Sequence, residues 1–259
     1  MDKLTIALVQ TTLYWEEIEK NLLHFERLLN PLQGKADLIV LPEMFTTGFS
    51  MAPGKLAEDM NGQSVNWLKS QSANLNSVLI GSLIIREKNR YFNRLFWMSP
   101  SGEFSIYDKR HLFRLGDENF HYTQGRIKLI QMIGDWRVRP LICYDLRFPV
   151  WSRNRDDYDL LVYIANWPEP RREVWKTLLK ARAIENQAFV IGVNRIGKDG
   201  NGIDYSGDSL AIDPKGIVIS HIQPYEEKIE LITLSLREVN DFRKKFPVSM
   251  DADEFECPW

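Results

Sequence analysis

Short runs rich in isoleucine, valine and leucine recur along the whole chain and constrain its fold more than any other feature. Several of them are apolar at nearly every position, which is typical of strands buried on both faces of a sheet. The runs lie at 4–10, 36–42, 77–85, 94–99, 127–133, 138–144, 159–166, 188–194, 209–213, 216–222 and 228–236. We therefore expect β-sheet at the centre of the fold.

Segments with the periodicity of amphipathic helices separate these runs. In the first of them Ile18, Leu22 and Phe25 recur three or four positions apart, which places them on one face of a helix. The helical segments are 15–32, 64–75, 172–188 and 235–245. Turn residues suited to hairpins stand at 101–102, 199–202 and 214–216. We expect an α/β protein whose strand-rich layer is covered by helices.

Length and composition fit an ordinary globular protein, and we expect residues 1–259 to form a single domain. Of the 259 residues 44% are hydrophobic and 26% charged, close to the averages of soluble domains. The 33 lysines and arginines nearly balance 35 acidic residues and form no basic stripe, so we expect no nucleic-acid partner. We recognise no secretory signal and no membrane-spanning run, and expect a cytoplasmic protein without a membrane partner. The acidic tail from about residue 247 is either a docking segment or a frayed end.

Side chains that bind metals or cofactors are sparse in this sequence. Cys143 and Cys257 form no CxxC pair and are too few for a disulfide framework. The four histidines lack the spacing that places two imidazoles on one metal ion. No glycine-rich phosphate loop joins a strand to a helix. We therefore expect neither a metal site nor a nucleotide cofactor.

Three of the strand-like runs end in residues that can carry out chemistry. The run 36–42 is followed by Glu43, the segment EFSIYDK ends at Lys109, and the segment PLIC ends at Cys143. Loops at the ends of strands converge on one edge of an α/β sheet. A carboxylate, an amine and a thiol in these positions can therefore share one pocket.

These three groups complement one another chemically. A thiol with an ordinary pKa of about 8.5 is mostly protonated at neutral pH, so a nucleophilic cysteine needs a neighbouring base or cation. Glu43 can accept the thiol proton, and Lys109 can supply positive charge. Lys109 and the backbone N–H of Tyr144 can then stabilise the oxyanion of a tetrahedral intermediate. Taken singly, each residue has a plainer interpretation, as a loop charge, a surface lysine and a small core residue.

The motifs around these residues resemble the nitrilase, or carbon-nitrogen hydrolase, superfamily. They are LPEMF around Glu43, YDKRHLF around Lys109 and ICYDLRFP around Cys143, and the similarity extends over 7–236. The resemblance implies a four-layer α-β-β-α sandwich, assembled as a homodimer or a higher homo-oligomer. It also implies hydrolysis of a small-molecule amide, or of another non-peptide C–N bond, without metal or organic cofactor.

The resemblance also implies a role for each residue of the triad. Cys143 would attack the amide carbon and form a thioester. Glu43 would take the thiol proton, protonate the departing ammonia and activate the water that cleaves the thioester.

A second glutamate of the superfamily lies between the lysine and cysteine motifs, shortly before a turn that ends in glycine. Glu118 has the corresponding spacing to Gly125 and would position Lys109 and the substrate amide. Gln124 stands where the superfamily commonly has proline. Asp117 is therefore a competing candidate for this role.

Within the superfamily the sequence looks most like the bacterial omega-amidases, which deamidate 2-oxoglutaramate or 2-oxosuccinamate. The similar segments are MFTTGFSM after Glu43, NWP at 166–168 and RAIENQAFVIGVNRIG at 182–197. Arg147 would clamp the carboxylate at the far end of such a substrate, or would form a structural salt bridge instead. Phe45, Tyr144 and Trp167 would line the walls of the pocket, or each would be an ordinary core residue instead.

Other functions remain open at this point. The same Glu-Lys-Cys site could act on an N-carbamoyl amine, a nitrile or another aliphatic amide. A catalytically silent binding protein could retain the fold, although it would not need all three residues. A metal-dependent hydrolase is disfavoured because clustered metal ligands are lacking.

Overall fold

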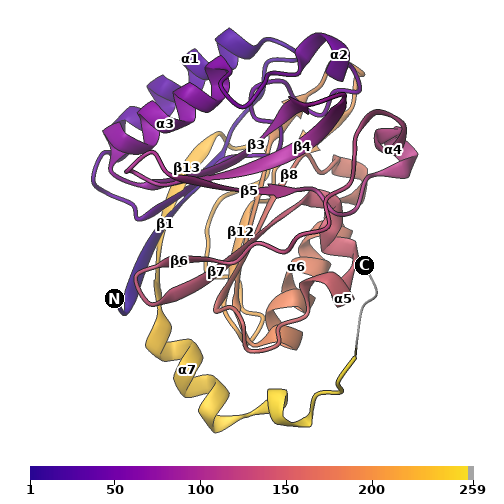
Figure 1. The fold of residues 1–259 in the computed structure, drawn as a ribbon. Coiled ribbons are helices and arrows are strands. Elements are labelled where there is room, and N and C mark those ends of the chain that lie inside the picture. The colour runs from indigo at the N-terminus through magenta and orange to yellow at the C-terminus, as the bar shows by residue number, and fades with distance from the viewer. Residues whose placement is uncertain (256–259) are drawn as a thin grey trace.

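The computed structural model describes residues 1–255 and has four layers, in the order helix, sheet, sheet, helix (Figure 1). This confirms the α-β-β-α sandwich. One sheet has six strands in the order β13-β1-β2-β3-β4-β5. Its strands are β1 (Lys3–Gln10), β2 (Leu38–Val40), β3 (Val78–Glu87), β4 (Arg90–Met98), β5 (Phe104–Asp108) and β13 (Lys228–Ser235).

The second sheet has five strands in the order β12-β9-β8-β7-β6. They are β6 (Gln131–Ile133), β7 (Trp136–Ile142), β8 (Leu160–Ala165), β9 (Phe189–Asn194) and β12 (Leu210–Ile212). A separate hairpin is formed by β10 (Ile196–Lys198) and β11 (Asp204–Ser206). Strands β1, β2 and β3 are parallel to one another, as are β7, β8 and β9. The carboxyl ends of each parallel set therefore meet at one edge of its sheet.

Helices cover the outer faces of the two sheets (Figure 1). The six-stranded sheet carries α1 (Ile18–Leu29) and α3 (Gln63–Leu75), and the five-stranded sheet carries α6 (Arg172–Asn186). The remaining α-helices are α2 (Pro53–Leu56), α4 (Glu118–His121), α5 (Pro149–Ser152) and α7 (Leu236–Lys245). The 3₁₀ helices are η1 (Asn30–Leu32), η2 (Arg114–Gly116), η3 (Cys143–Arg147), η4 (Glu169–Arg171) and η5 (Val248–Asp251).

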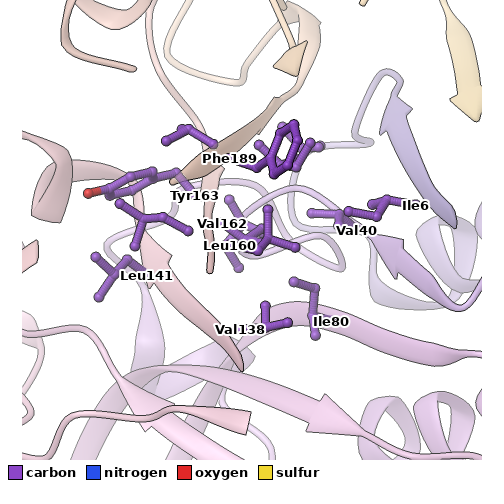
Figure 2. Close-up of a cluster of buried hydrophobic side chains, with 14 of the residues drawn as sticks. Ile6, Val40, Ile80, Val138, Leu141, Leu160, Val162, Tyr163 and Phe189 are labelled. Atoms are coloured by element: carbon purple, nitrogen blue, oxygen red, sulfur yellow. The ribbon is translucent and has the colours of Figure 1, made fainter. Parts of the chain in front are cut away.

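The core follows from the period-two alternation of side chains along the strands. In β2, Leu38 and Val40 face the second sheet, whereas Ile39 packs under α1 and α3. Figure 2 shows Val138 of the second sheet beside Ile80 of the first, in the apolar layer between them. Both faces of the inner strands are buried, which explains why these runs are apolar at nearly every position.

Two of the expected strands are shorter or missing. The turn at Pro214–Gly216 forms, with the Gly216 N–H donating to Asp213, but residues 216–222 make only an isolated bridge to β12 at Val218. In the run 127–133 only the last three residues are a strand. Ile127 and Ile217 are 81% and 58% exposed, so these apolar residues lie on the surface and lack the packing that would hold an extended strand.

The acidic tail crosses the surface near α5. After η5 the chain runs to Phe255, whose ring lies under the guanidinium of Arg155 at 4.4 Å. Cys257 falls outside the described residues. No helix in residues 1–255 combines the length and the apolar character needed to cross a lipid bilayer.

Candidate active site

The structure brings Glu43, Lys109 and Cys143 together, each close behind the end of a strand. Lys109 directly follows β5, Cys143 directly follows β7, and Glu43 lies three residues after β2. The Lys109 Nζ lies 2.8 Å from the Glu43 Oε1. All three side chains are buried. The thiol, the carboxylate and the amine therefore share a site at the carboxyl ends of these strands.

Three donors fix the Glu43 carboxylate. Oε1 accepts hydrogen bonds from Lys109 and from the Asn93 side-chain amide, both at 2.8 Å, and Oε2 accepts one from the Asn166 backbone N–H at 2.8 Å. The Asn166 side chain in turn donates to the Glu43 carbonyl. Bonds of this kind hold the carboxylate in one orientation.

Glu118 lies on the other side of Lys109, at the start of α4. Its carboxylate lies 3.0 Å from the Lys109 Nζ, and Oε2 accepts the Phe113 backbone N–H at 2.6 Å. Asp117 instead has a left-handed backbone conformation and an exposed side chain. Of the two competing residues, Glu118 is the one that contacts the lysine.

Burial and charge shift the pKa values in this site. Burial alone would lower the pKa of Lys109, but the carboxylates of Glu118 and Glu43 outweigh it and raise that pKa. Burial also raises the pKa of Glu118, against the pull of the Lys109 charge. Burial and the negative charge of Glu43 raise the pKa of the Cys143 thiol well above its usual value, although Lys109 opposes them. The sulfur therefore rests as a thiol, and positive charge alone does not make it a thiolate.

The turn that carries Cys143 is built around Asp145. Cys143 has a φ of +43°, a left-handed conformation that is uncommon for a residue with a side chain. The buried Asp145 carboxylate accepts hydrogen bonds from the Ile142 N–H at 3.1 Å, from Tyr107 Oη at 2.7 Å and from the His111 N–H at 3.0 Å. These bonds stabilise the strained turn and link it to the segment that carries Lys109.

A glycine holds the turn after Glu118 against the lysine. The Gly125 N–H donates to the Lys109 carbonyl at 2.9 Å. A Cβ at Gly125 would lie 2.0 Å from the carbonyl oxygen of Asp108. Only glycine fits this close approach.

A cavity of about 250 Å³ opens beside Cys143. Tyr144, Arg147 and Trp167 line it, together with Phe49, Met51, Lys109, Phe113, Leu115, Gly116, Asn166, Pro168, Arg171, Asp199, Asn201, Ile203 and Tyr205. The lining is largely apolar and aromatic, with a few charged groups, which is typical of a small-molecule site. Within residues 1–255 no group of three or more His, Cys, Asp or Glu side chains is placed to hold a metal ion.

Phe45 was expected in the wall of this cavity, and this prediction is wrong. Met44 has a φ of +44°, and Phe45 is fully buried in the layer of α1 and α3. Its ring contacts Phe25 and Trp67, with centroids 5.3 and 5.7 Å away. The side chain of Phe45 therefore belongs to the core.

Arg147 faces the cavity and stacks on its wall. The guanidinium carbon lies 5.3 Å from the ring centroid of Trp167. Among residues 1–255 it forms no ion pair with a carboxylate, so the structural salt bridge that we considered is absent from this part of the chain. Its charge is therefore available to a bound anion.

Sequence reasoning missed Asn93. It lies in the middle of β4 and donates to both Glu43 and Glu118, at 2.8 and 3.2 Å. The only signal in the sequence is a polar residue inside the run RYFNRLFWM. Asn166 stands in the NWP segment, but its contacts with Glu43 could not be read from the sequence.

Comparisons with known proteins identify the family of this chain. The sequence model of the carbon-nitrogen hydrolase family matches residues 5–244. Omega-amidase YafV of Escherichia coli strain K12 is 47% identical over 98% of this chain and 99% of its own length. The 2-oxoglutaramate amidase of Bacillus subtilis strain 168 is 33% identical over 96% of this chain and 97% of its own length.

A solved structure is similar over the full length. XC1258 from Xanthomonas campestris, described as a CN-hydrolase superfamily protein with an arsenic adduct in its active site, is 44% identical. The two structures have a TM-score of 0.97, and each chain is covered completely. The chain belongs to the carbon-nitrogen hydrolase family, in agreement with the motifs around Glu43, Lys109 and Cys143.

Proposed function

We propose that this protein is an omega-amidase that releases ammonia from a small 2-oxo dicarboxylic acid monoamide, 2-oxoglutaramate or 2-oxosuccinamate. The observation that carries the proposal is the buried contact of Glu43 with Lys109 beside Cys143, at a cavity that Arg147 also lines. The names of the two relatives, omega-amidase and 2-oxoglutaramate amidase, support the same reaction. We infer the following sequence of steps.

In the first half-reaction Glu43 takes the Cys143 proton as the sulfur attacks the amide carbon. The resulting oxyanion lies between the Lys109 ammonium and the Tyr144 backbone N–H. The raised pKa of the thiol fits concerted proton transfer, because the resting sulfur is neutral and a base must act during attack. Protonated Glu43 then gives its proton to the leaving nitrogen, the C–N bond breaks, and ammonia departs from a thioester on Cys143.

In the second half-reaction a water molecule replaces ammonia. Glu43 takes a proton from this water while its oxygen attacks the thioester carbon, and Lys109 again stabilises the oxyanion. The C–S bond breaks, and the departing sulfur recovers the proton held by Glu43. The new carboxylic acid gives its remaining proton to the solvent, the product leaves as a dicarboxylate, and the thiol and the carboxylate of the enzyme are restored.

Glu118 and Asn93 act as positioning residues in this scheme. Both contact Lys109 or Glu43, and neither lines the cavity. With Glu43 and Glu118 on either side, Lys109 remains protonated through the cycle. The arrangement stabilises the negative oxygen without requiring the lysine to exchange a proton.

The part of the cavity that Arg147 lines suits a carboxylate. Arg147 carries a charge that no acid of the described chain neutralises, and Tyr144 and Trp167 supply apolar walls for the short carbon chain. We propose that Arg147 binds the carboxylate of the substrate through paired N–H donors.

We further propose that the protein acts as a cytoplasmic homodimer or higher homo-oligomer of one-domain chains. A reactive free thiol at Cys143 needs a reducing compartment. Large apolar side chains remain exposed near the segment that carries Glu118, at Leu115, Phe120 and Ile127. Exposed apolar groups of this size are typical of contact surfaces between subunits.

The experiment that tests the proposed function is a substrate panel for the unaltered enzyme. Ammonia release is measured with 2-oxoglutaramate, with glutamine and with an N-carbamoyl amino acid, and CO₂ release is followed in parallel. We expect the highest kcat/KM with 2-oxoglutaramate and no CO₂. Release of CO₂ together with ammonia would instead identify an N-carbamoyl substrate and contradict the proposal.

A further inference from the structure

A second arginine lines the same cavity as Arg147. Arg171, the last residue of η4, lies over Phe113 with its guanidinium carbon 5.4 Å from the ring centroid. The Trp167 indole N–H donates to the Arg171 carbonyl at 2.8 Å, and the guanidinium of Arg147 lies over the Trp167 ring. One tryptophan therefore contacts both arginines, one through its ring and one through its N–H.

The surroundings of Arg171 differ from those of the next residue. Arg172 forms a paired interaction with Asp208, at 2.7 and 3.0 Å, outside the cavity lining. In the part of the chain that the structure describes, Arg171 forms no ion pair with a carboxylate. A guanidinium held over an aromatic ring and facing a cavity without an acid partner is suited to an anionic ligand.

Asp199 is the acidic residue among the described residues of the lining, and its carboxylate already accepts hydrogen bonds from the protein. Asp199 accepts the backbone N–H groups of Asn201 and Ile203 on Oδ1, at 2.8 and 3.0 Å, and Tyr205 Oη on Oδ2, at 3.0 Å. These bonds belong to its own hairpin loop. The carboxylate is therefore occupied and does not offer a free acceptor to an ammonium group of a ligand.

The charges of the lining favour a ligand with one negative charge at its far end. Lys109 is paired with Glu43 and Glu118, which do not line the cavity, and the other charged residues of the lining are Arg147 and Arg171 against Asp199. A monoamide with one carboxylate matches this excess of one positive charge. An ammonium group next to that carboxylate would instead face guanidinium groups in a largely apolar cavity.

We propose that Arg171 determines which omega-amide the enzyme accepts, by binding the carboxylate end together with Arg147 and by excluding an ammonium group at carbon 2. Arg171 thereby selects the 2-oxo acid amide over glutamine, which has the same chain length. This inference rests on the proposed function and adds a residue and a rule of selection to it.

The test compares four amides with the unaltered enzyme and with Arg171→Gln. They are 2-oxoglutaramate, glutaramate without a group at carbon 2, glutamine, and pentanamide without a carboxylate. We expect Arg171→Gln to lower kcat/KM by about 10- to 100-fold for the first two, through KM more than kcat, because a lost charge-assisted bond acts in the ground state and the transition state alike. Activity on glutamine should fall less, and activity on pentanamide should stay unchanged.

Two further variants separate this role from a structural one. Arg171→Lys keeps the charge and should recover part of the lost activity on the carboxylate-bearing amides. Arg114→Gln removes the same charge from an exposed residue beside the cavity that is not part of its lining, and should change no ratio. Equal losses on all four amides, or no loss on any, would overturn the role of Arg171. An unaltered enzyme inactive on both 2-oxoglutaramate and glutaramate would overturn the proposed function and this inference with it.

Discussion

At the residue scale, the reactivity of Cys143 depends on a few groups that are held close together in a small buried volume. Glu43 accepts three hydrogen bonds while it faces a thiol whose pKa is raised. The thiol is therefore protected until a substrate arrives, and the base is in place when the attack begins. An unpaired thiolate would be open to alkylation and oxidation at all times.

The role of Glu43 as the base leads to a prediction for Glu43→Gln. Glutamine can accept the hydrogen bonds of Asn93 and Lys109 but cannot take a proton from sulfur. We expect kcat to fall by roughly 100- to 10,000-fold, the usual contribution of a general base. Steady-state ammonia release measures this loss, and a thermal melt checks the fold. A variant that keeps near-normal kcat would show that another group accepts the proton.

The role of Arg147 is tested by a substitution that keeps its charge. Arg147→Lys retains the positive charge and loses the paired N–H donors and the flat surface that stacks on Trp167. We expect a loss in kcat/KM on the order of tenfold for carboxylate-bearing amides and little change for neutral ones. Kinetics on 2-oxoglutaramate and on pentanamide make the comparison. Equal losses on both would indicate that Arg147 supports the fold of the turn instead.

At the scale of elements, the site depends on turns that contact each other across the two sheets. The segment 118–125 runs from Glu118 back to the Lys109 carbonyl, and the turn at Cys143 is tied through Asp145 to Tyr107 on β5. Movement of any one of these segments therefore shifts two catalytic groups relative to each other.

Gly125 is the position in this arrangement that leaves least room for a side chain. In Gly125→Ala the new methyl group would overlap the Asp108 carbonyl, so the backbone beside Lys109 must move. We expect a loss of about 2–4 kcal/mol in the free energy of unfolding, and a lower kcat in the protein that remains folded. Denaturant unfolding and ammonia release measure the two effects.

Gly54→Ala provides the matched control. A Cβ at Gly54 would meet nothing closer than the Tyr91 hydroxyl at 3.8 Å, so stability should change by no more than about 0.5 kcal/mol. If Gly125→Ala were as well tolerated as this control, the turn would not be holding Lys109 in place.

Many of the strands, and the residues at their ends, could be predicted from the sequence. Strands buried on both faces appear as continuous apolar runs, and β7, β8 and β9 lie where such runs predict them. Glu43, Lys109 and Cys143 stand in motifs at strand ends, so their chemistry could be inferred before their contacts were known. The run 216–222 has the composition of a strand, but it lies at the edge of a sheet and does not extend it.

Other features depend on where individual side chains point, and the sequence does not show this. The left-handed conformation of Met44 cannot be read from LPEMF, so the sequence alone predicts that Phe45 follows Glu43 into the pocket. A lone asparagine in an apolar run gives no indication that Asn93 reaches two carboxylates. Arg171 likewise stands among charged residues, and its place in the cavity depends on η4 and on Trp167.

At the scale of the whole molecule, one core joins both sheets, and the site lies at the carboxyl ends of strands from both. The apolar layer between the sheets contains residues from β1 and from β9, so neither sheet is a separate unit. Loss of packing in this layer would separate Glu43 and Lys109, which follow strands of one sheet, from Cys143, which follows a strand of the other.

The oligomeric state is also a property of the whole molecule. We expect light scattering to give a particle mass of twice 30.3 kDa or a higher multiple, because Leu115, Phe120 and Ile127 present large apolar surfaces near the active site. The measurement should be made at the enzyme concentrations used for kinetics. A mass of 30.3 kDa with full activity would show that a single chain is sufficient.

The central claim is that Cys143 carries the substrate as a thioester. Mixing the enzyme with 2-oxoglutaramate, quenching in acid and analysing the digested protein by mass spectrometry tests it most directly. We predict an acyl adduct on the peptide that contains Cys143, and neither an adduct nor turnover in Cys143→Ala. An unmodified peptide during turnover, together with normal ammonia release by Cys143→Ala, would contradict the account.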